Sequence, residues 1–299
     1  MLISVRRSAI GVRMRKHGSS LLVLPALSVV AILVAGIGVL AWDSLHTFNA
    51  FYATLGNLSL TQYASTVTDP QFKVDIVRTL AMGSLTSVVA VTLALPVALV
   101  ITRSKSRLFR LALLIVTFVP WLTGDITRTF GWLVVLGPRG PLVWLCNQLG
   151  IAPPSLIATL WAVGFGTVQV LVPPAVVILL PAILRLDPEL EYAANTLGAR
   201  PYQAFLRVTL PQLRVACFGA LAACWALGMG DFADPQILGQ GVRDYLANFL
   251  QNRYLELGDV PQGAATGVIL IVLVTLGAAL ILTLGRLRWP RRLSVGRVR

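Results

Sequence analysis

Six mostly apolar stretches, each close to the length that crosses a bilayer, decide what this chain can fold into. An α-helix of about 20 apolar residues spans the hydrocarbon layer, and it satisfies its backbone N–H and C=O groups internally. Of the 299 residues, 56% are hydrophobic and 12% are charged, whereas a soluble domain carries about 25% charged residues. The sequence therefore predicts an all-α membrane protein with six transmembrane helices. We expect these at residues 21–42, 76–102, 111–136, 156–184, 215–232 and 263–285.

The basic residues of the chain are distributed unevenly between the two sides of the apolar stretches. The net charge is +13, which on its own would fit a nucleic-acid-binding protein. Arginine and lysine, however, gather in the segments on one side of the apolar stretches, as in the cytoplasmic loops of membrane proteins. We therefore expect a lipid bilayer and no nucleic acid as partner. The expected order is a cytoplasmic basic N-terminus (1–20), a transmembrane domain (21–285) and a cytoplasmic basic tail (286–299), so that both termini are cytoplasmic.

The fourth apolar stretch carries an unusual number of helix-breaking residues. Gly164, Gly166, Pro173, Pro174 and Pro181 all fall within it. Such residues are tolerated in a bilayer where the helix faces protein or a water-filled cavity. The sequence therefore predicts an irregular helix that lines a channel.

A polar segment, residues 187–213, separates the fourth and fifth stretches. Asp187 is suited to cap a first short helix, and Gly198 to end it in a left-handed conformation. Pro201 is suited to open a second helix, which we expect to end at Pro211, before the fifth span. The charge pattern puts this helix–turn–helix on the cytoplasmic side, where it would serve as a docking element for another protein.

The sequence contains no set of residues that is typical of an enzyme. There is no phosphate-binding loop of the form GxxxxGK[ST], the two histidines are isolated, and the three cysteines lack a metal-binding spacing. We therefore expect no catalytic residue, no metal and no cofactor. A membrane chain with these features is typical of a transporter or channel. An ion-coupled secondary transporter is an alternative, but the acidic residues in mid-span and the inverted repeats of that class are not evident.

Part of the polar segment resembles a known family motif. The run from Tyr192 to Gly198, followed after nine intervening residues by Val-Thr-Leu-Pro, is similar to the EAA loop of ABC importer permeases. Tyr192 stands where that family has glutamate, and Glu191 lies one residue earlier, a displacement of about 100° around a helix. The resemblance implies that these residues couple the chain to an ATPase. The expected coupling residues are Glu191, Ala193, Ala194, Gly198, Val208, Leu210 and Pro211.

Two further stretches, residues 119–132 and 230–239, resemble motifs of the spermidine/putrescine permeases within that family. The resemblance implies a type I ABC importer permease fold in a bacterial inner membrane. It also implies three partners, which are a cytoplasmic ATPase dimer that hydrolyses ATP, a second homologous permease chain and an external solute-binding protein. A polyamine is the expected solute; ferric iron, thiamine and other organic cations are alternatives. The candidate solute pathway consists of Asp125, Arg128, Trp132, Asp231 and Asp234.

Overall fold

The computed structural model describes residues 18–49, 54–151 and 155–287. Most of the expected basic N-terminus and tail lies outside these ranges. The described chain is almost entirely helical, and six of its helical segments are long and apolar enough to cross a membrane, as expected. These segments are Pro25–Asp43, Pro70–Arg103, Asp125–Gln148, Leu160–Leu184, Pro201–Met229 and Val260–Arg286.

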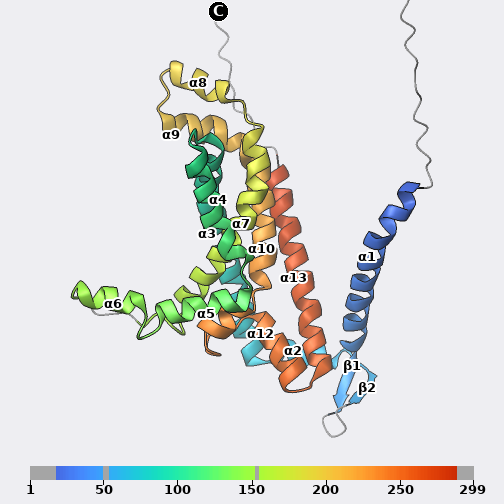
Figure 1. Cartoon of the computed structure of the whole chain (residues 1–299). Coiled ribbons are helices and arrows are strands. Elements are labelled where there is room, and N and C mark those ends of the chain that lie inside the picture. Colours follow the sequence, from blue (N-terminus) through green and yellow to red (C-terminus); the bar gives the residue numbers. More distant parts are fainter. Residues whose placement is uncertain (1–17, 50–53, 152–154, 288–299) are drawn as a thin grey trace, which may run out of the picture.

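Three long helices form the centre of the bundle: α3 (Pro70–Arg103), α7 (Leu160–Leu184) and α10 (Leu210–Met229). They run side by side in Figure 1. Small side chains on α3 allow α7 to approach closely, and close van der Waals packing is what drives helix association where lipid is as apolar as leucine. The buried residues at this contact include Ala90, Ala94, Ala98, Leu171, Ala175, Val176 and Leu179.

Two further long helices flank this centre. Helix α13 (Val260–Arg286) packs along α10, and Gly277 lies directly against the indole of Trp225. Helix α1 (Gly18–Asp43) meets α13 near one end, where Leu40 contacts Gly267. From that contact, α1 diverges from the bundle (Figure 1). Its side chains from Pro25 to Val39 are exposed, so this part of α1 has no packing neighbour among the described residues.

The expected third span, residues 111–136, is wrong as a single helix. The chain forms α4 (Arg107–Leu122) and α5 (Asp125–Leu136), with extended backbone at Thr123 and Gly124 between them. The break places Asp125 in the first turn of α5, where the helix dipole favours a negative charge. Helix α4 runs along the bundle, whereas α5 lies across it and leads outward to α6 (Pro141–Gln148) (Figure 1).

The expected irregularity of the fourth span is also wrong. Helix α7 is continuous although it contains Pro173, Pro174 and Pro181. It lies in the centre of the bundle, where neighbouring helices cover its buried face. A proline in a membrane helix loses one backbone hydrogen bond, and surrounding protein makes this tolerable without a break.

The short elements lie at the two ends of the bundle (Figure 1). One end carries α8 (Pro188–Thr196) and α9 (Pro201–Ala204). The other carries α2 (Thr61–Thr68) and a β-hairpin. In the hairpin, His46 pairs with Leu58 and Asn49 with Thr54. The remaining elements at that end are β1 (His46–Asn49), β2 (Thr54–Leu58), α11 (Ala233–Leu238), α12 (Leu246–Gln251) and a π-helical turn at Asn252–Glu256.

The contact between the Trp225 indole and Gly277 allows the packing of α10 against α13 to be tested. A Cβ atom at Gly277 would lie 2.6 Å from the indole nitrogen of Trp225, so Gly277→Leu is expected to destabilise the protein by about 1–3 kcal/mol through overpacking. The matched control is Gly219→Leu on α10, where nothing lies within 4 Å of the added Cβ. Thermal unfolding in detergent, followed by size-exclusion chromatography, measures both. Equal melting temperatures for the two variants would contradict the contact.

Candidate functional site

The polar segment after α7 has most of the expected local structure. The Asp187 side chain accepts a hydrogen bond from the backbone N–H of Glu189 at 2.9 Å and so caps α8. Gly198 has a φ of +89°, which side chains rarely adopt, and it turns the chain toward α9. Pro201 opens α9 at its first turn. These three predictions are confirmed.

The expected end of the second helix at Pro211 is wrong. The chain continues from α9 through a π-helical turn, Phe205–Thr209, directly into α10, and Pro211 lies in the first turn of α10. Pro211 has no N–H to donate and its ring crowds the preceding turn. The wider π-helical turn just before it lets the helix continue. Helix α9 is thereby continuous with the transmembrane helix α10.

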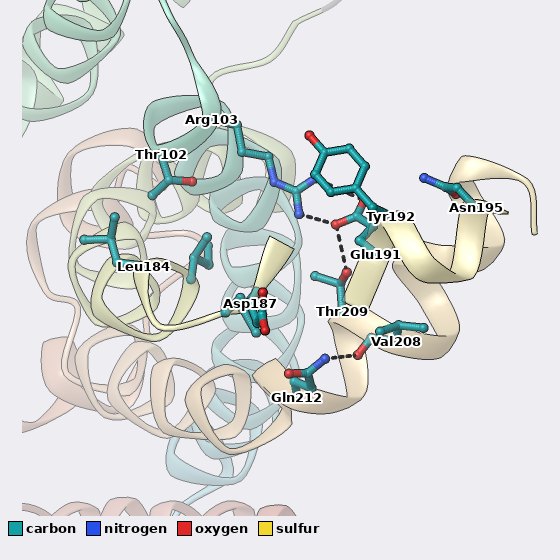
Figure 2. A pocket seen from close by; sticks show the side chains of 12 residues that line it. Thr102, Arg103, Leu184, Asp187, Glu191, Tyr192, Asn195, Val208, Thr209 and Gln212 are labelled. Carbon is teal, nitrogen blue, oxygen red and sulfur yellow. Dashed lines mark hydrogen bonds and ion pairs between the residues drawn. The ribbon is translucent and has the colours of Figure 1, made fainter. Parts of the chain in front are cut away.

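Glu191 connects α8 to two other elements (Figure 2). Its Oε2 accepts from Arg103 Nη2 at 2.5 Å, and its Oε1 accepts from Arg103 Nη1 at 3.1 Å. Thr209 Oγ1 in the π-helical turn donates to Oε2 at 3.2 Å. The hydrogen bonds from Arg103 are the main reason why the pKa of Glu191 lies below its ordinary value. The carboxylate is therefore ionised at neutral pH and held by its own chain.

Several other side chains of this segment are exposed, although Tyr192 also lines a cavity beside Arg103 and Glu191. Leu197 is 89% exposed, Tyr192 is 69% exposed, and Leu190 and Tyr202 are also exposed. Ala193 and Gly198 are exposed with them, while Ala194, Val208 and Leu210 are half-buried and Pro211 is exposed. The expected coupling residues therefore fall into an outward group that another protein can reach and an inward group that fixes the fold of the segment.

A cavity of about 450 Å³ lies between α8 and the ends of α3 and α7. The Arg103–Glu191 pair lies at this cavity, with Thr209 and Asp187 (Figure 2). Helix α8 is thus separated from α3 by open space except where these side chains bridge it. Sequence reasoning missed Arg103 and Thr209 in this role, because Arg103 and Glu191 are 88 positions apart and no sequence signal indicates their contact.

The candidate solute-pathway residues meet near the opposite end of the bundle. Arg128 Nη2 donates to Asp125 Oδ1 at 2.8 Å, which agrees with an ion pair between residues one helical turn apart. Arg128 is buried, whereas the Asp125 side chain is 70% exposed. Thr167 Oγ1 on α7 donates to Asp231 Oδ2 at 2.6 Å. Asp125, Arg128, Thr167 and Asp231 line a cavity of about 580 Å³.

Asp234 lies behind this cavity and is buried. Thr129 Oγ1 donates to Asp234 Oδ1 at 2.7 Å, which joins α5 to α11. The carboxyl group lies against Gly166, where an added Cβ would come within 2.8 Å of it. Trp132 also faces α7, since its indole N–H donates to Gln169 Oε1 at 2.7 Å and its ring packs edge-on against Phe165. Both residues bind α5 to its neighbours and do not line the cavity.

Within the described ranges, no group of three or more histidine, cysteine, aspartate or glutamate side chains is placed to hold a metal ion. The two cavities described above, with their polar and charged walls, are therefore the candidate sites of function.

The sequence of the chain matches a known protein family. The family model described as "Binding-protein-dependent transport system inner membrane component" matches residues 83–289. The chain is 27% identical to the inner membrane ABC transporter permease protein YdcU of Escherichia coli, over 82% of each chain. It is 28% identical to the spermidine/putrescine transport system permease protein PotB of Haemophilus influenzae, over 82% of this chain and 84% of that one.

Two solved structures share the fold. One is a chain of the bacterial alginate ABC transporter in complex with an alginate pentasaccharide-bound periplasmic protein. It has a TM-score of 0.73 at 16% identity, over 90% of this chain and 93% of that chain. The other is a chain of the inward-facing MetNI methionine ABC transporter, with a TM-score of 0.51 at 18% identity, over 73% of this chain and 96% of that chain.

The buried Asp234 provides a test of the hydrogen bond that joins α5 to α11. Thr129→Val removes the hydroxyl that donates to Asp234, and an unsatisfied buried acceptor costs about 1–3 kcal/mol. We expect a lower melting temperature for this variant in detergent. Thr127→Val, an exposed threonine in the same helix, is the matched control and should melt like the parent protein. The interpretation fails if the two valine variants are equally stable.

Proposed function

The chain belongs to the family of binding-protein-dependent transport system inner membrane components, and on this basis we propose that it forms half of the translocation pathway of an ATP-driven importer. A second homologous permease chain supplies the other half. A periplasmic protein delivers the solute, as in the alginate transporter structure. ATP is hydrolysed by a separate cytoplasmic ATPase dimer, so the chain itself is not an enzyme.

The docking of the ATPase at α8 and α9 is supported by the exposure of this segment. Leu197 and Tyr192, at the end of α8 and within it, are largely exposed. A rigid element with exposed aromatic and aliphatic side chains is what a protein interface requires. The rigid connection from α9 into α10 gives the ATPase a route for moving a transmembrane helix. This combination of exposed surface and continuous helix is the observation that carries the proposal.

The proposed orientation places α8 and α9 in the cytoplasm. The first described residues of α1 and the last of α13 lie toward the same end of the molecule as α8 (Figure 1). Basic residues are frequent at this end, and cytoplasmic loops are enriched in arginine and lysine. The basic residues include Arg103, Lys105, Arg107, Arg110, Arg185, Arg200 and Arg207. Both termini then face the cytoplasm, and the β-hairpin faces the periplasm.

We further propose that the solute is a small organic cation of the polyamine class. The 580 Å³ cavity carries two carboxylates, those of Asp125 and Asp231, and one guanidinium, that of Arg128. The negative excess suits an ammonium group. The similarity to PotB supports the same class. Ferric iron and thiamine are the alternatives, and an ion-coupled secondary transporter is opposed by the family match.

Gly198 allows the docking proposal to be tested. Gly198→Gln is expected to abolish ATPase binding and uptake while membrane insertion persists, because glutamine both strains the turn and adds bulk to the exposed surface. Gly150→Gln is the matched control. Gly150 also has a positive φ, +69°, and open space around its Cβ position, but it lies away from α8. Co-purification of the ATPase and solute uptake in proteoliposomes measure both variants. Normal uptake by Gly198→Gln would refute the docking role.

Asp231 allows the solute proposal to be tested. In proteoliposomes that contain the complete importer and its solute-binding protein, we expect uptake of labelled spermidine or putrescine. Asp231→Asn should lower this uptake about tenfold, because the variant loses the charged acceptor that we propose for the ammonium group of the solute. The control is Glu256→Gln, which neutralises an exposed acid at the same end of the bundle. Uptake of thiamine or iron in place of polyamines would overturn the proposed class.

A further inference from the structure

The Arg103–Glu191–Thr209 cluster joins three separate elements of the molecule. Arg103 is the last residue of α3, Glu191 lies in α8, and Thr209 ends the π-helical turn before α10. Both oxygens of the Glu191 carboxylate accept hydrogen bonds within the chain. The carboxylate of Glu191 is therefore already hydrogen-bonded within the chain, although it lies in the segment that we propose as the docking site of the ATPase.

We propose that Arg103, Glu191 and Thr209 form a tie that makes α8 move as one body with α3 and α10. Glu191 is then a positioning residue in coupling, and it acts inside the permease rather than at the ATPase surface. This proposal rests on the proposed docking function of α8. It assigns the transmission of movement to one ion pair and one hydrogen bond.

Little else holds α8 against the bundle. The helix packs chiefly on α9 and the π-helical turn, and the 450 Å³ cavity lies between it and the ends of α3 and α7. Across the described residues, no other hydrogen bond or ion pair joins α8 to α3. At its C-terminal side the chain turns at Gly198, a residue that permits many backbone conformations. Without the tie, α8 can pivot about this turn when a partner pulls on it.

The geometry of the pair suits orientation better than stability. Half of the Arg103 side chain is exposed, and exposed ion pairs contribute little to the stability of a fold. Two nitrogens of the Arg103 guanidinium, however, donate to the two oxygens of the Glu191 carboxylate. Such a bidentate ion pair fixes the orientation of α8 relative to α3. Thr209 fixes the carboxylate from a third side. Loss of the tie should therefore change movement and leave folding intact.

The first experiment measures the tie directly. Spin labels on Thr196→Cys in α8 and Val100→Cys in α3 report the distance between the two helices, in the importer assembled with its partners and with the native cysteines replaced by alanine. Glu191→Gln is expected to broaden the distance distribution. Glu189→Gln, an exposed acid on the same helix without an ion pair among the described residues, should leave it narrow. An unchanged distribution in Glu191→Gln overturns the proposal.

The second experiment measures the consequence. Arg103→Ala and Glu191→Gln are each expected to lower solute uptake per ATP hydrolysed about tenfold, within the range seen for residues that carry coupling, while the ATPase still co-purifies. The exchanged pair Arg103→Glu with Glu191→Arg should restore both uptake and the narrow distance. Arg107→Ala removes an exposed arginine four residues after Arg103, and it is the control for loss of positive charge.

The outcomes separate this proposal from the docking function. If Glu191→Gln releases the ATPase while the distance stays narrow, Glu191 is a partner contact and the tie is wrong. If the exchanged pair restores neither distance nor uptake, the tie is also wrong. If Gly198→Gln keeps the ATPase and normal uptake, the docking function fails, whereas the distance measurement still decides whether the tie exists.

Discussion

The close approach of α3 and α7 is the contact on which the other features of this molecule depend. Ala90, Ala94 and Ala98 are fully buried at this contact and bring the two helices together without large side chains between them. In a bilayer, where burial of apolar surface gives no advantage over lipid, such packing supplies the association energy. Both candidate sites lie at the ends of these two helices. Arg103 ends α3, and Thr167 lies near the other end of α7.

The two polar clusters at these ends differ in what they contribute. The Arg103–Glu191 pair is partly exposed, and an exposed ion pair contributes at most about 1 kcal/mol. The Asp234 carboxyl is buried against Gly166 and bonded to Thr129, so the loss of its partner would leave a buried polar atom unsatisfied. The Arg103–Glu191 ion pair at one end of the bundle can therefore be broken at little cost in stability, whereas the Thr129–Asp234 hydrogen bond at the other end is costly to break. An element that must follow a partner's movement is expected at the first end.

The sequence predicted the parts of the structure that local physics determines. The length of the apolar stretches predicted long apolar helices, and five of the six expected stretches coincide with a helical segment long enough to cross a membrane. Asp187, Gly198 and Pro201 predicted the turn and caps around α8. The failures have a common cause. The continuity of α7 through its prolines, the π-helical turn before Pro211 and the break at Thr123–Gly124 depend on neighbouring helices. The contact of Arg103 with Glu191 depends on the packing of α3 against α7, which no local pattern specifies.

The direction of the Glu191 side chain in α8 follows from this packing. Glu191 and Tyr192 are about 100° apart around α8. Glu191 faces α3 and the π-helical turn, where Arg103 and Thr209 hold its carboxylate. Tyr192 is 69% exposed, and it lines the same cavity as Arg103 and Glu191. In this chain the acid and the exposed aromatic ring are neighbouring residues, so the acid binds within the permease while the ring remains accessible to the proposed ATPase.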